Sequence, residues 1–217
     1  MIRTFNGKTI VNAPWQRAVE RIVMMALESK IRVLGLASPQ SASGVSMLAR
    51  SIAEVSAHSG IATLLLDLSR RAGDSVTGGW VPRPGRGPQL AVRDLAGFEI
   101  LFGDPAPGAR FLFNNVAQLR LAMEQELAPY GLIVVDLAPI GIIPDDAINP
   151  LAAALACDGV VVVGTMGHVT RTALVQAMHL MRSSGVKLLG TVTRDASRTR
   201  SRGPLRAPPG KTADAKH

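Results

Sequence analysis

A loop of small residues follows the first apolar run of the chain and leads into a helix-period segment. From Ala37 to Met47 it reads Ala-Ser-Pro-Gln-Ser-Ala-Ser-Gly-Val-Ser-Met. Small residues, a glycine and then a helix N-terminus are typical of a phosphate-binding loop, because the free N–H groups of the helix point toward the anion. The residues of this candidate nucleotide site are Ser41, Ala42, Ser43, Gly44, Val45, Ser46 and Met47.

The residue after the loop glycine decides how well such a loop can work. A functional loop places a lysine there to bridge the terminal phosphates, and this chain has Val45 instead. Ser46 remains at the position of a hydroxyl that binds magnesium. The sequence therefore predicts a degenerate phosphate loop that keeps the hydroxyl and lacks the cation.

Two carboxylates end later apolar runs. Asp67 closes the run Leu-Leu-Leu-Asp and is followed by Ser69, and Asp136 closes Leu-Ile-Val-Val-Asp. In open α/β sheets ligands bind at the carboxyl ends of the strands, so both carboxylates are expected near the loop. If a magnesium nucleotide binds, Ser46, Asp67 and Asp136 are the candidate metal ligands.

The elements that must position these residues alternate along the chain. Short apolar runs predict strands, and helix-period segments lie between them. Expected strands are 32–37, 62–67, 132–136, 159–164 and 187–192, with 98–102 as a weaker candidate. Expected helices are 13–29, 44–58, 110–128, 145–156 and 170–184. This alternation predicts an α/β fold with a doubly wound, mainly parallel sheet and helices on both faces.

The N-terminal helix and one long loop complete the expected organisation. In the helix 13–29, an apolar stripe is expected to pack on the sheet, with a contact between subunits as the alternative; it consists of Trp15, Ala18, Val19, Ile22 and Ala26. Residues 73–88 are rich in Gly and Pro and predict an irregular loop. We expect one α/β domain over residues 1–193 and a basic tail over 194–217.

The order of these motifs resembles the cytoplasmic domain of bacterial tyrosine kinases (BY-kinases), P-loop proteins related to MinD and ParA. The family's loop, Ser-Pro-x-x-Gly-x-Gly-Lys-Ser-Thr, aligns with Ser38-Pro39 and with Gly44-x-Ser46. Its Asp-x-Asp-x-Arg motif corresponds to residues 67–71, and its Tyr-Asp-x-Val-Ile-Ile-Asp-Thr-Pro-Pro motif to residues 130–139. The resemblance runs from about residue 18 to residue 193.

Departures from the family pattern fall on the residues that the resemblance implies for catalysis. The loop lysine is Val45, and the second aspartate of the Asp-x-Asp-x-Arg motif is Ser69. The family carries a C-terminal tyrosine cluster for autophosphorylation, but the one tyrosine of this chain is Tyr130, which begins an expected buried strand. The resemblance therefore implies a degenerate member that has lost kinase activity.

Composition bounds the remaining possibilities. The chain has 217 residues, 47% of them hydrophobic, and a net charge of +8. The lone Cys157 and four scattered histidines exclude a disulfide framework and a zinc cluster. No apolar run is long enough to cross a bilayer, and the N-terminus lacks a signal-peptide apolar region, so we expect a cytoplasmic protein.

The positive charge concentrates in the tail. Residues 194–217 hold seven Lys or Arg against two Asp, and the rest of the chain holds 17 against 14 acidic residues. Such a segment, poor in apolar residues, is expected to be disordered. It could contact anionic lipid, nucleic acid or an acidic partner, or it could be a solvated end without a ligand. With two Trp, one Tyr and five Phe in the whole chain, a nucleic-acid stacking surface is not expected.

Two functions of different classes follow from the resemblance. The first is a non-catalytic accessory of exopolysaccharide or capsule export that binds a transmembrane polysaccharide co-polymerase at the inner face of the membrane and needs no cofactor. The second is an active kinase or ATPase with an atypical loop, which would bind ATP and Mg²⁺ weakly. A MinD/ParA-like positioning factor, held on membrane or DNA by its basic tail, is a third alternative.

Overall fold

The computed structural model describes residues 3–5, 8–10, 13–41, 44–71, 79–83, 87–141 and 146–195. Its nine strands are β1 (Arg3–Phe5), β2 (Lys8–Ile10), β3 (Val33–Ala37), β4 (Thr63–Leu68), β5 (Val92–Arg93), β6 (Glu99–Phe102), β7 (Leu132–Leu137), β8 (Gly159–Met166) and β9 (Leu188–Asp195). Its α-helices are α1 (Ala13–Glu28), α2 (Val45–His58), α3 (Pro107–Arg110), α4 (Val116–Gln125), α5 (Pro150–Ala156) and α6 (Arg171–Ser183). Short 3₁₀ helices are η1 (Pro88–Leu90) and η2 (Phe111–Asn114).

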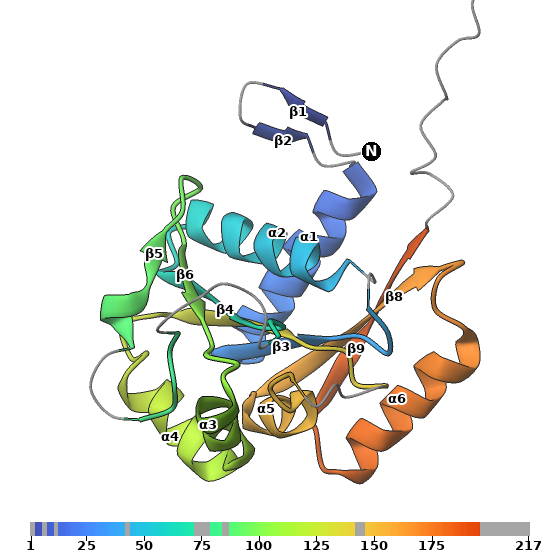
Figure 1. Cartoon of the computed structure of the whole chain (residues 1–217). Helices are drawn as coiled ribbons and strands as arrows, with labels where there is room; N and C mark the ends of the chain where they lie inside the picture. The colour runs from blue at the N-terminus through green and yellow to red at the C-terminus, as the bar shows by residue number, and fades with distance from the viewer. Residues whose placement is uncertain are drawn as a thin grey trace, which may run out of the picture.

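Seven strands form one mainly parallel sheet in the order β5-β6-β4-β7-β3-β8-β9, and β1 and β2 pair separately as an antiparallel hairpin. All pairings in the large sheet are parallel except that between β5 and β6. Helices α1 and α2 cover one face, and α4, α5 and α6 cover the other (Figure 1). The expected fold class, a doubly wound sheet of the P-loop type, is confirmed.

The central strands are buried on both faces, which explains why their sequences are continuous apolar runs. Alternate side chains of β3 serve two separate cores: Leu34 and Leu36 pack with α1 and α2, whereas Val33 and Ala37 pack with the helices of the opposite face. The stripe of α1 faces the sheet as expected, since Val19, Ile22 and Ala26 are buried in the first of these cores.

Three expected element boundaries were wrong. The segment expected as one helix over 110–128 divides at Asn115, whose side chain accepts a hydrogen bond from the Gln118 amide and starts α4. The helix expected from Asp145 begins at Pro150, because Asn149 caps it. Strand β9 ends at Asp195, so it includes the first two residues of the segment assigned to the tail. The remainder of that tail, 196–217, lies outside the described residues.

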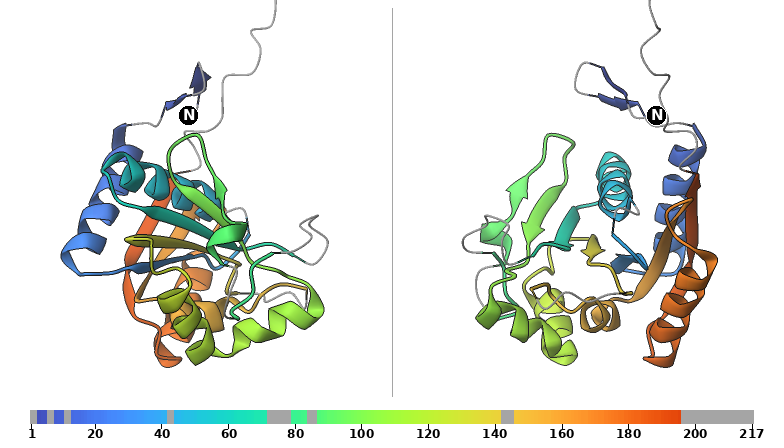
Figure 2. Two further views of the ribbon diagram at one scale, coloured as in Figure 1. Left: turned by 90° about the vertical axis from the view of Figure 1, so that its left-hand side faces the viewer. Right: turned by 45° about the vertical axis from the view of Figure 1, so that its right-hand side comes forward.

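The loop expected over residues 73–88 holds a structured part that its composition did not indicate. Trp80 is 1% exposed, forms a parallel bridge to Gly103 beside β6, and packs edge-on against Phe113. Glu126 holds this segment, because its carboxylate accepts from Trp80 Nε1 at 3.2 Å and from the Gly87 amide at 3.1 Å. Figure 2 shows the segments around β5 and β6 at the opposite margin of the sheet from β9.

Candidate functional site

The loop after β3 and the N-terminus of α2 form one wall of a cleft at the carboxyl ends of the strands. Gly44 precedes α2 with φ 80° and ψ 19°, a left-handed conformation that suits glycine. No side chain caps this helix and no acidic residue lies in its first turn, so its first N–H groups are oriented toward the cleft. This is the local geometry that the loop sequence predicted.

A second loop, after β7, is tied closely to the first. The amides of Ile140 and Gly141 donate to the carbonyls of Ser38 and Pro39 at 2.8 and 3.0 Å. A Cβ atom at Gly141 would lie 2.3 Å from the Pro39 carbonyl oxygen, so this approach requires glycine. The two loops therefore hold each other at the mouth of the cleft.

The cleft has a volume of about 400 Å³ and collects most of the expected site residues. Ser41, Gly44, Val45, Ser46, Met47 and Asp136 line it. Ala42 and Ser43 lie outside the described residues. Six lining residues were not assigned to the site from the sequence: Ser38, Gln40, Ser69, Arg71, Leu137 and Pro139. Arg71 occupies the arginine position of the Asp-x-Asp-x-Arg motif, which was the available signal.

Val45 belongs to the protein core. It is 7% exposed and packs with Leu48, Ile52 and other apolar residues of the α1–α2 face. Its side chain offers no positive charge to a phosphate. The position where a phosphate loop needs lysine is therefore part of the hydrophobic packing, in agreement with the sequence reading of a loop without its cation.

Asp136 is a buried carboxyl group of the cleft. It is 3% exposed, and its Oδ1 atom has no hydrogen-bond partner. Burial raises the pKa of its carboxyl to about 7; the hydrogen bond from Ser46 lowers this pKa, and the neighbouring Asp67 charge raises it. The structure thus brings together Ser46, Asp67 and Asp136, the three residues expected as metal ligands.

Asp67 is already engaged by its own loop. One of its oxygens accepts from the Ser69 amide at 3.0 Å and from the Ser69 hydroxyl at 2.8 Å. The other accepts from Arg70 Nε at 3.3 Å, and the Arg70 guanidinium lies 3.8 Å from the centre of the Phe102 ring. Ser69 therefore supports Asp67 instead of adding a second carboxylate.

These residues fit part of a magnesium nucleotide. The helix N-terminus suits a phosphate oxygen, and Ser46, Asp67 and Asp136 supply the oxygen donors that Mg²⁺ prefers. The lysine that would neutralise the terminal phosphates is missing. Among the residues that the structure describes, no cluster of three or more His, Cys, Asp or Glu forms a metal site elsewhere.

Comparison with known proteins agrees with this geometry. The chain is 27% identical to the tyrosine-protein kinase CpsD of Streptococcus agalactiae, over 74% of each protein. It superposes on the kinase domain of the Escherichia coli tyrosine kinase ETK with a TM-score of 0.69, at 18% identity, over 89% of this chain and 78% of that chain. The chain has the fold of a bacterial tyrosine kinase domain. The resemblance inferred from the motifs is confirmed.

The wider fold group is also represented. The septum site-determining protein MinD of Pyrococcus horikoshii, a structure with Mg-ADP, superposes with a TM-score of 0.58 at 12% identity, over 78% of this chain and 72% of that chain. No protein-family model matches the chain.

Two further sequence expectations concern tyrosine and the membrane. Tyr130 is 7% exposed and its hydroxyl donates to Glu99, so the lone tyrosine is buried as expected. Burial, together with Glu99, raises the pKa of this phenol. Within the described residues, no helix combines the length and the apolar character needed to span a bilayer.

Proposed function

We propose that this chain is a non-catalytic accessory of bacterial exopolysaccharide or capsule export, with a bacterial tyrosine kinase fold that serves as a binding surface. Its partner is the cytoplasmic segment of a transmembrane polysaccharide co-polymerase, and the chain works at the inner face of the cell membrane. The similarity to CpsD supports the assignment to exopolysaccharide or capsule export. The single observation that carries the loss of catalysis is Val45, buried in the core where the phosphate lysine is required.

Phosphoryl transfer depends mainly on positioned charge, and each missing charge costs about 3 kcal/mol of transition-state stabilisation. This chain lacks the loop lysine, and Ser69 donates its hydroxyl to Asp67 where a second carboxylate would stand. Its tyrosine is buried against Glu99 and is not available as a phosphate acceptor. Three independent requirements of a tyrosine kinase are therefore unmet.

A second candidate function is nucleotide binding by the atypical loop, as an ATPase or a kinase. The observation that favours it is Asp136 Oδ1, which is buried in the cleft without a partner, as a metal-ligand oxygen would be before metal binds. Arg71 also lines the cleft and brings a positive charge to it. This candidate requires that Asp136 be essential in the cell.

Complementation of a gene deletion separates the two candidates. Deletion is expected to abolish surface polysaccharide, and the Asp136→Asn variant to restore it fully, because binding does not use the carboxylate. A matched variant, Asp104→Asn, controls for loss of a carboxylate outside the cleft. Loss of secretion with Asp136→Asn, in a variant shown to be folded and abundant, supports the nucleotide-binding candidate and contradicts the non-catalytic one. Co-purification with the co-polymerase in detergent tests the partner directly.

A further inference from the structure

The two edges of the large sheet differ in how they are protected. The edge strand β5 has only two residues, and a very short edge strand limits pairing with another chain. The other edge, β9, has eight residues, and no other strand of the described chain pairs with its outer side. A register irregularity is confined to its start, and residues 190–195 pair continuously with β8. An open, regular edge of this length can accept an added strand.

A groove runs beside this edge. It has a volume of about 490 Å³ and lies between α1 and β9. Ala18, Ile22 and Met25 of α1 form its apolar side, and Gly190 to Thr193 form the strand side. The strand side is open: Gly190, Thr191 and Thr193 are exposed, and Val192 is half-buried. The groove therefore offers apolar contacts next to unpaired main chain.

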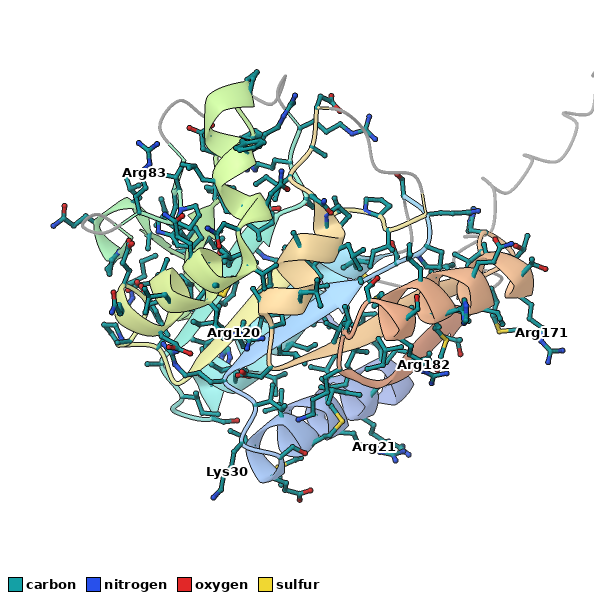
Figure 3. The ribbon with its side chains drawn as sticks, turned by 90° about the horizontal axis from the view of Figure 1, so that it is seen from below. Arg21, Lys30, Arg83, Arg120, Arg171 and Arg182 are labelled. Carbon is teal, nitrogen blue, oxygen red and sulfur yellow. The ribbon has the colours of Figure 1, made fainter. Side chains whose placement is uncertain are left out.

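The charge around the edge is net positive. Residues 159–195, which build β8, α6 and β9, contain four Lys or Arg and one Asp, and α1 on the other side of the groove carries two Arg and two Glu. Arg171, Arg182 and Lys187 of this unit are exposed. Among the described residues that line the groove, Arg21 is the only charged one. Figure 3 shows Arg21 on α1 and Arg182 on α6, the helices that cover the two faces of the sheet, with Arg83 on the opposite side of the molecule.

We propose that β9 and the groove beside it bind an extended acidic segment of a partner protein, which adds to the sheet as an eighth strand. Main-chain hydrogen bonds to β9 would supply affinity, and alternate apolar side chains would enter the groove on the α1 face. The carboxylates between them would point to the opposite face of the sheet, toward α6, and pair with Arg182. The proposal does not depend on the proposed function, since it names the chemistry of the segment and not its source.

Charge argues against two other occupants. The chain's own residues 196–217 hold six Lys or Arg and one Asp, so they would be repelled from this net-positive edge. A second copy paired through β9 would place two such basic edges against each other. The open main chain and apolar groove favour a protein strand over an anionic membrane, which could use the same positive charges without using β9.

The test uses the full chain and a fluorescent peptide of about nine residues in which Val alternates with Asp or Glu. We expect saturable binding, with protection from hydrogen exchange confined to the amides of 188–195. The Arg182→Glu variant should weaken binding about tenfold at low salt, and Arg83→Glu, the matched charge change on the opposite side, should leave it unchanged.

Two control peptides separate strand addition from charge alone. A peptide with alternate N-methylated amides keeps its charge but loses hydrogen-bond donors, and it should bind at least tenfold more weakly. A peptide with Lys in place of Asp and Glu should not bind. Equal binding of the N-methylated peptide, protection outside β9, or binding to phosphatidylglycerol vesicles without binding to the peptide would overturn the proposal.

Discussion

Asp67 and Asp136 are register partners on the neighbouring parallel strands β4 and β7. The two carboxylates therefore meet at the same edge of the sheet. Asp67 is satisfied by Ser69 and Arg70, whereas Asp136 keeps a buried oxygen without a partner. Burial, together with the neighbouring charge of Asp67, raises the pKa of Asp136 to about 7.

This elevated pKa predicts a specific pH dependence of stability. The folded protein holds a proton on Asp136 more tightly than the unfolded chain, whose carboxyl has a pKa of 3.8. The contribution of protonated Asp136 to the free energy of unfolding is fully present below pH 3.8. It is lost as the pH rises to about 7. Asparagine carries no titrating proton, so we expect the Asp136→Asn variant not to show this loss. The unfolding free energy of the variant minus that of the wild type should therefore increase by a few kcal/mol between about pH 4.5 and 8.

Urea unfolding at a series of pH values measures this difference. Glu124→Gln, which removes an exposed carboxylate from α4, is the control and should track the wild type throughout. A constant difference between Asp136→Asn and wild type across the range would mean that Asp136 is ionised in the folded protein at all of these pH values.

The strands were predictable because their signal is local. Burial on both faces makes a parallel strand apolar along its whole length, so the run 132–136 identified β7 to within one residue. The expected positions of the loop and of Asp136 followed from these runs. The order of strands in the sheet was not predictable, because it depends on which helix faces pack together across the chain.

The missed features depend on contacts between distant residues. Nothing in the Gly- and Pro-rich segment indicates that Trp80 is buried, because its partner Glu126 lies 46 residues away on the turn after α4. The engagement of Asp67 by Ser69 was missed for another reason. The serine in place of an aspartate was interpreted as the loss of a carboxylate, although its hydroxyl forms a new hydrogen bond to Asp67.

We expect the hydrogen bonds that Glu126 accepts to make a measurable contribution to the free energy of unfolding. Glu126→Ala leaves Trp80 Nε1 and the buried Gly87 amide without their acceptor, and we expect a loss of about 2–4 kcal/mol in unfolding free energy. Glu126→Gln keeps one acceptor oxygen and should lose less than half as much. Denaturant unfolding with Trp fluorescence measures both. Equal losses for the two variants would show that the negative charge, and not the acceptor, is what stabilises the segment.

We expect the basic tail to make an electrostatic contact with the membrane fraction that weakens as the salt concentration rises. We expect truncation after Asp195 to change the melting temperature by less than about 2 °C, because a segment so poor in apolar residues adds little to the core. Truncation should also weaken sedimentation with the cell's membrane fraction at low salt. A full-length variant with Gln at the Lys and Arg positions of 196–217 separates charge from length. Unchanged sedimentation of that variant would contradict an electrostatic role.

The last prediction concerns Val45, the residue on which the proposed loss of catalysis depends. The wild-type protein is expected to bind Mg-ATP weakly or not at all, because no lysine neutralises the terminal phosphates and Arg71 carries the only basic side chain among the described residues that line the cleft. Calorimetry with Mg-ATP measures this directly. A micromolar dissociation constant would support the nucleotide-binding candidate instead.

The Val45→Lys variant restores the lysine that a phosphate loop needs at this position. It should cost about 1–3 kcal/mol of stability, because an ammonium replaces an apolar side chain that is 7% exposed in the α1–α2 core. It should not create kinase activity, since Ser69 stands in the place of the second carboxylate and Tyr130 is buried. Val45→Met, of similar length without the charge, controls for the packing change. Phosphotyrosine formed by Val45→Lys alone would show that one lysine separates this fold from an active kinase, and the non-catalytic proposal would then depend on Val45 only.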